Sequence, residues 1–133
     1  MIWLDLADGA RRRRGPVGQV MAAGIPMADI TRADMLRLGD AALAISFDKF
    51  SDGRGFTVAR HVREALAFKG PIVATGHVIP DQADYLRRCG FTHVEIDQGH
   101  AAQWRRSLAL APPAMQRVLG SPRARYRLSG QGP

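Results

Sequence analysis

The sequence predicts a small α/β domain, a parallel sheet built from consecutive βα units. Apolar runs of strand length alternate with segments of helical periodicity, and glycine or proline closes most of them. Strands that alternate with helices pair in parallel through right-handed crossovers. A three-layer sandwich and a half-barrel-like arrangement both fit this pattern, and the 133 residues have the size of one domain.

The central part of the chain carries the clearest elements, because its apolar runs are typical of strands buried on both faces. The predicted strands span residues 2–6, 17–22, 41–47, 72–75 and 94–96. The predicted helices span residues 31–38, 57–68, 80–89 and 101–110. Thr31 and Asp34 form the pattern of a capping box at the start of the first helix. Met35, Leu36 and Leu38 are expected to face the core.

The net charge of +7 is concentrated at the two ends of the chain. Residues 15–116 contain eleven Lys or Arg and ten Asp or Glu, so the excess lies in Arg11–Arg14 and beyond residue 116. Basic ends on a near-neutral body are typical of solvated tails, and docking to an acidic protein is the alternative. Nucleic acid is a less expected partner, because stacking aromatic side chains are sparse there. We expect residues 1–120 to form the domain and residues 121–133 to be a disordered basic tail.

Composition also limits the class of protein. The sequence has no apolar stretch near the roughly 20 residues that a membrane span needs, and its start does not resemble a signal peptide. We therefore expect a cytoplasmic protein that does not contact a membrane. The single cysteine, Cys89, excludes an internal disulfide and a thiolate metal cage, so no metal site is expected. The sequence carries neither a Walker loop nor a dinucleotide fingerprint, and the cofactor stays unknown.

Two polar loops, residues 51–57 and 76–82, each follow a predicted central strand. Such loops emerge at the carboxyl edge of a parallel sheet, where ligands bind in open α/β folds. If the two strands are neighbours, the loops face each other. Gly53 and Gly55 lack a Cβ, so the backbone there can turn sharply and approach a ligand. Arg54 offers a planar fork that fits carboxylate, phosphate, sulfate or sulfite.

The candidate site residues come from these loops and their flanks. The predicted ligand-binding residues are Lys49, Asp52, Gly53, Arg54, Gly55 and Gln82. The candidates for proton transfer are Asp52, His77 and Asp81, because carboxylate and imidazole groups serve as general acids and bases. The structural alternative is that Arg54 pairs with Asp52 or Asp81 and ties the loops together, while Asp81 caps its helix.

The same residues carry a resemblance to one bacterial family, the domain-of-unknown-function family 934. It covers about residues 41–96, and its most specific parts are Asp52-Gly53-Arg54-Gly55, Asp81-Gln82 and Arg88-Cys89-Gly90-Phe91. The chain departs from the family pattern at Asp48, which replaces proline, at His77, which replaces an acidic residue, and at Pro80, which replaces arginine.

What the resemblance implies is a pathway. Members of the family are typically encoded beside assimilatory sulfite reductase and have been loosely labelled oxidoreductases of sulfite reduction. One hypothesis is a non-catalytic accessory protein, with sulfite reductase or its electron donor as partner in electron delivery or assembly. The alternative is a small-anion-binding enzyme that uses the Arg/Asp site at the carboxyl edge, and the sequence does not decide whether the chain is an enzyme.

Overall fold

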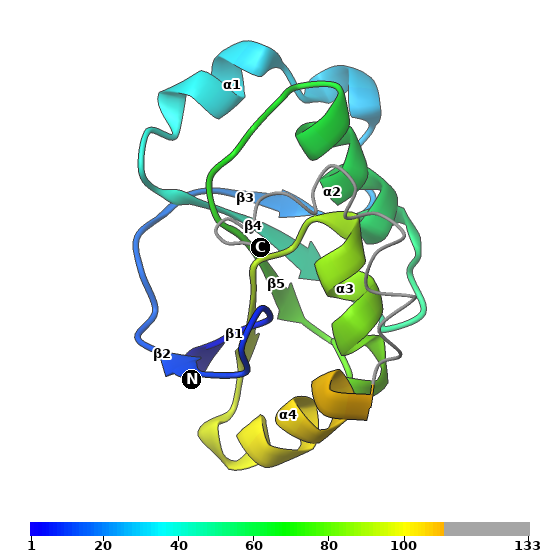
Figure 1. Cartoon of the computed structure of the whole chain (residues 1–133). Coiled ribbons are helices and arrows are strands. Elements are labelled where there is room, and N and C mark those ends of the chain that lie inside the picture. Colours follow the sequence, from blue (N-terminus) through cyan, green and yellow to red (C-terminus); the bar gives the residue numbers. More distant parts are fainter. Residues whose placement is uncertain (111–133) are drawn as a thin grey trace.

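A computed structural model describes residues 1–110 as one six-stranded sheet with helices packed on it (Figure 1). The strands are β1 (Ile2–Asp5), β2 (Arg11–Arg12), β3 (Val17–Ala22), β4 (Ala42–Phe47), β5 (Ile72–Gly76) and β6 (His93–Ile96). The helices are α1 (Arg32–Arg37), α2 (Arg54–Glu64), α3 (Ala83–Cys89) and α4 (Ala101–Leu110), with 3-10 turns η1 (Met27–Asp29), η2 (Pro80–Gln82) and η3 (Gln98–His100). The predicted tail at 121–133, and the domain boundary before it, lie outside the described residues.

The sheet has the order β2-β1-β6-β5-β4-β3. Strands β3, β4, β5 and β6 are parallel neighbours in chain order, as the alternation of strands and helices predicts. Strand β1 pairs antiparallel with β6, and β2 pairs antiparallel with β1. The predicted small parallel-sheet α/β domain is therefore confirmed, with an antiparallel hairpin added at one edge.

The helices of the described part lie on one face of the sheet, the arrangement that a half-barrel-like fold gives (Figure 1). The core between the layers joins alternate strand residues to the apolar sides of the helices. Leu43, Ile45 and Phe47 of β4 contribute to this core. The opposite face carries a smaller cluster, in which the Trp3 indole packs with Ala42, Ala44 and Val73.

Local signals in the sequence explain where most elements begin and end. The capping box of α1 is present, since the Thr31 side chain accepts from the Asp34 backbone and Asp34 accepts in return. Gly90 ends α3 in the left-handed region at φ 113°, and the Phe91 backbone then donates to Leu86. Met35 of α1 and Leu38 just after it are buried as predicted, but the assignment of Leu36 to the core is wrong: it is 76% exposed, because residues three apart share a helix face and the residue between them does not.

Candidate functional site

The two predicted polar loops meet at the carboxyl edge of the sheet. Strands β4 and β5 are parallel neighbours, and the His77 backbone donates to the Phe47 carbonyl at 2.8 Å. The Gln82 amide then crosses between the loops and donates to the Phe50 carbonyl at 2.6 Å. Gly76, at φ 85°, makes this approach possible, since a Cβ there would lie 2.4 Å from the Phe47 carbonyl oxygen.

A hollow of about 440 Å³ opens at this edge, between the ends of β3 and β4. Its lining comes from the end of β3 and the segment that follows it, and from the end of β4 and the β4–α2 loop. The lining residues are Val20, Met21, Ala22, Ala23, Gly24, Ile25, Ser46, Asp48, Asp52 and Arg54. The first predicted loop thus contributes to the hollow through Asp52 and Arg54, beside the β3 segment rather than the β5–α3 loop.

A bidentate ion pair between Arg54 and Asp52 forms the polar wall of the hollow. The Arg54 Nε donates to one carboxylate oxygen and NH2 donates to the other, each at 2.9 Å. These bonds lower the pKa of Asp52, and they raise the pKa of Arg54 together with the charge of Asp52. The Arg54 side chain remains 71% exposed, so its outer N–H groups are open to a ligand.

The glycines of the first loop have roles that differ from those expected. Helix α2 begins at Arg54 rather than at Thr57, with Gly53 as its N-cap, and the Asp52 carboxylate accepts the Arg54 backbone N–H at 3.1 Å just before it. Gly55 therefore lies inside α2 and is buried, where a Cβ would lie 2.3 Å from the Phe47 ring. Its small size lets the helix approach β4 closely. Gly53 precedes the helix at φ −67°, and open space surrounds its Cα.

The other predicted site residues lie around the hollow without lining it. Lys49 is exposed in the β4–α2 loop, and its charge makes a small contribution to the lowered pKa of Asp52. His77 is exposed at the start of the β5–α3 loop, and Asp81 is exposed in η2. Gln82 bridges the loops and also accepts the Ile79 N–H at 3.2 Å. The structure thus brings Asp52 and Arg54 together, whereas neither His77 nor Asp81 is among the residues that line the hollow.

Sequence reasoning identified only Asp52 and Arg54 among the residues that line the hollow, and it missed Gly24, Ser46 and Asp48 as well as the apolar lining. The Arg54 guanidinium lies against Gly24, where a Cβ would lie 2.8 Å from Cζ. A signal for this segment was available, since the carboxyl-edge rule applies equally to the loop after the predicted strand at 17–22. Asp48 was visible as a departure from the family pattern, but the sequence does not show which way it points.

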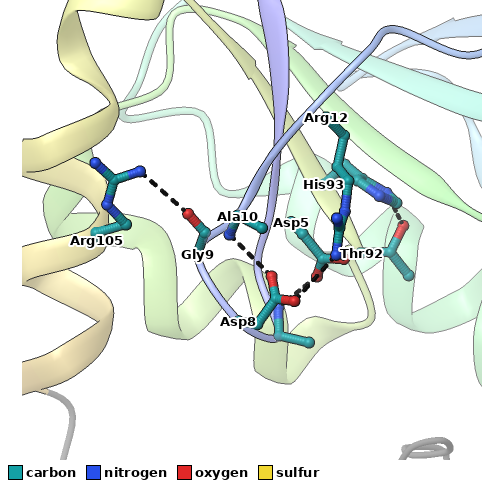
Figure 2. Close-up of polar contacts among 9 residues, drawn as sticks. Asp5, Asp8, Gly9, Ala10, Arg12, Thr92, His93 and Arg105 are labelled. Atoms are coloured by element: carbon teal, nitrogen blue, oxygen red, sulfur yellow. Dashed lines mark hydrogen bonds and ion pairs between the residues drawn. The ribbon is translucent and has the colours of Figure 1, made fainter.

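The arginine hairpin, residues 2–14, is a second polar region. It forms the side of the sheet at β2 and β1, at the other end of the strand order from β3 and β4. In its register Trp3 lies opposite Arg12 and Leu4 lies opposite Arg11. Because strand residues alternate between faces, Arg12 and Arg11 point to opposite sides of the sheet. Figure 2 shows Arg12 beside the two carboxylates with which it pairs, Asp5 at 3.5 Å and Asp8 at 3.0 Å.

The other arginines of the hairpin differ in how they are neutralised. Arg14 pairs with Glu95 of β6 at 3.6 Å. Arg11 and Arg13 are exposed, and neither forms an ion pair within residues 1–110. Arg105 of α4 reaches the turn of the hairpin, where NH1 lies 3.5 Å from the Gly9 carbonyl oxygen (Figure 2). The hairpin and α4 thus gather unneutralised positive charge at one edge of the molecule.

Fold and sites together define a small α/β protein with a polar hollow at the ends of β3 and β4 and a cationic hairpin at β1 and β2, on the other side of the sheet. No helix in residues 1–110 is both long and apolar enough to cross a membrane. Within the same residues, no group of three or more His, Cys, Asp or Glu side chains is placed to hold a metal ion.

The chain belongs to a family described as bacterial proteins of unknown function, DUF934, whose model matches residues 32–126. The match extends on both sides of the motifs that carry the resemblance in the sequence. Comparison with curated proteins gave no match. Comparison with solved structures gave none either.

Proposed function

We propose that this protein is an accessory factor of assimilatory sulfite reduction, which docks on sulfite reductase or on its electron donor. In this role it is a non-catalytic partner that aids electron delivery or assembly. The pathway rests on what the family resemblance implies about the neighbourhood in which members are encoded. The docking mode rests on the charge of the arginine hairpin.

The observation that carries the proposal is the fixed position of the arginine run. Arg11 and Arg12 are paired into the sheet through β1, so the run belongs to the folded edge rather than to a free tail. Arg12 and Arg14 have carboxylate partners, whereas Arg11 and Arg13 present their charge without one in the described residues. A rigid cationic edge of this kind speeds and orients association with an acidic protein surface.

The alternative is a small-anion-binding enzyme that uses the hollow at the carboxyl edge, with Arg54 holding the anion. The observation in its favour is that Arg54 lines the hollow and keeps outer N–H groups exposed. Asp52 and Asp48 line the same hollow, however, and a free anion would meet two carboxylates beside one guanidinium. The charge balance therefore favours the accessory role.

A binding measurement with purified cognate proteins tests the proposal. The wild-type chain is immobilised, and the sulfite reductase and its electron donor are passed over it separately at low and high salt. We expect one of them to bind with a Kd of about 10 μM or tighter. Raising NaCl from about 50 to 500 mM should weaken binding about ten-fold or more, because exposed charges are screened.

Charge reversal identifies the surface. The double variant Arg11→Glu with Arg13→Glu should weaken binding about ten-fold or more, because two attractive contacts become repulsive. The matched control reverses Arg32 and Lys69, two exposed cations outside the hairpin, and should bind like the wild type. Absence of binding to both proteins, or equal losses in the two double variants, would refute the proposed docking.

A further inference from the structure

We infer that the hollow between β3 and β4 binds a small zwitterion of the α-amino acid class, with its ammonium on Asp48 and its carboxylate on Arg54. This site is distinct from the arginine hairpin. It does not depend on the proposed docking to a partner. The argument rests on charge, shape and one close glycine contact.

The charges of the hollow divide into a neutral pair and one remaining carboxylate. Asp52 takes the Nε and one NH2 hydrogen of Arg54, which leaves the N–H groups of NH1 for another acceptor. The Asp48 carboxylate has no hydrogen bond or ion pair with the described residues, and it is near enough for its charge to raise the pKa of Arg54 slightly. The hollow thus offers an unpaired anion and an incompletely used cation.

A ligand that carries both charges satisfies these two groups together. A free anion would be attracted to Arg54 and repelled by Asp48, and a simple cation would leave the NH1 donors of Arg54 unused. A zwitterion places opposite charges on both and forms charge-assisted hydrogen bonds at each end. Lys49 is exposed in the same loop but does not line the hollow, so it leaves the balance inside unchanged.

The size and the apolar walls of the hollow fit the carbon part of such a ligand. Its volume of about 440 Å³ lies within the roughly 300–1,000 Å³ of small-molecule sites. Val20, Met21, Ala23 and Ile25 provide apolar lining beside the charged groups. An amino acid with an apolar side chain can therefore be held at its charged end and covered along its side chain.

Gly24 leaves the space that the Arg54 guanidinium occupies. A Cβ at this position would lie 2.8 Å from both Cζ and NH1 of Arg54, so a side chain would displace the charged group. The atoms it would meet are the flexible end of an exposed arginine, so the displacement should cost little stability. Gly24→Ala is therefore a variant that moves the proposed ligand contact and spares the fold.

The inference is tested by ligand-observed NMR and calorimetry on the full chain with the twenty proteinogenic L-α-amino acids, up to about 10 mM. We expect at least one to bind. Its N-acetyl derivative, which lacks the ammonium, and its methyl ester, which lacks the carboxylate, should each bind about ten-fold more weakly or worse, since each loses a charged contact. Inorganic sulfate should bind more weakly than the amino acid.

Matched variants assign the contacts. Asp48→Asn and Gly24→Ala should each weaken binding about ten-fold, whereas Asp40→Asn and Gly99→Ala, an exposed aspartate and a glycine with open surroundings, should not. Thermal melts of the four variants check that each of them folds. Binding of no amino acid, or equal binding of the N-acetyl derivative, or tighter binding of sulfate, overturns the inference. The arginine hairpin double variant should bind the amino acid normally, which separates this test from that of docking.

Discussion

The arginine hairpin and the hollow lie at opposite edges of one sheet and handle charge in different ways. At the hollow, Arg54 is fixed in a bidentate pair by Asp52 from its own loop, and the pair rests on buried glycine and aromatic packing. At the hairpin, only two of four consecutive arginines have carboxylate partners in the described residues: Arg12 pairs with Asp5 and Asp8, and Arg14 pairs with Glu95. At the hollow the arginine is compensated and the Asp48 carboxylate is left over, whereas the hairpin keeps an excess of positive charge.

The difference shows that local geometry decides what a charged residue can do. A β-strand sends neighbouring residues to opposite faces, so in β2 Arg12 lies on the side of its carboxylate partners and Arg11 on the other side. Just before α2, by contrast, one carboxylate concentrates its bonds on one arginine: Asp52 accepts from both the backbone N–H and the side chain of Arg54. A hollow with a few fixed charged groups suits a small ligand, and an exposed excess of positive charge suits a large partner that is attracted from a distance.

The largest effect is expected where the hollow depends on close packing. Gly55→Val would place Cβ about where the Phe47 ring lies, and we expect a loss of about 1–3 kcal/mol in the free energy of unfolding. Gly53→Ala, two residues earlier, has open surroundings and should change stability by less than about 0.5 kcal/mol. Urea unfolding measures both. If the two variants behaved alike, packing of α2 on β4 would not support the hollow.

A pH effect of intermediate size is expected at the hairpin edge. His93 of β6 lies opposite Asp5 of β1. Burial is the main cause that lowers the pKa of His93 below 6.5. The charge of Arg12 lowers this pKa further, and the charges of Asp5 and Asp8 oppose the shift. The unfolded chain therefore takes up a proton before the folded protein does. Stability should be fully present above about pH 6.5 and should fall as the pH drops from there through the lowered pKa of His93.

Urea unfolding between pH 8 and pH 5 measures this dependence. The centroid of the His93 ring lies 5.4 Å from that of the Trp3 ring, so His93→Gln also changes the stability at pH 8, but it should remove this part of the pH slope. His77→Gln, at an exposed position of the opposite edge, is the control and should leave the slope in place. The Asp52 carboxylate acts in a separate window, since its pKa is lowered from 3.8 by the hydrogen bond from Arg54. A slope that survives His93→Gln would contradict the assignment.

How much the sequence could predict follows from the range of each signal. The α/β class, the parallel pairing of β4 with β5 and the C-cap at Gly90 depend on local patterns, and they agree with the structure. The predicted start of α2 at Thr57 is three residues late, because the first helical turn contains Gly55, which the apolar periodicity does not register as helical. Leu36 was placed in the core because α1 is too short for its periodicity to fix the buried side.

The candidate site was predictable in part. The strands before the two polar loops are neighbours, as the prediction that the loops face each other requires, and Gln82 of the second loop bonds to Phe50, just before the first. The carboxyl-edge rule does not say which neighbour of β4 contributes to the hollow. In the structure that neighbour is β3 rather than β5. The antiparallel place of β1 beside β6, on which the arginine hairpin depends, is a long-range pairing without a local signal.

The smallest effect separates the two halves of the arginine run. Arg12→Ala removes ion pairs with Asp5 and Asp8, and because these groups are partly exposed it should cost up to about 1 kcal/mol of stability. Arg11→Ala removes no ion pair within residues 1–110 and should be neutral or slightly stabilising, since it relieves repulsion in the run. Urea unfolding in about 50 mM and 500 mM NaCl should show the difference shrinking as salt screens the ion pairs. Equal effects of the two substitutions would mean that strand alternation does not divide the run, and the free positive side proposed for docking would then lose its basis.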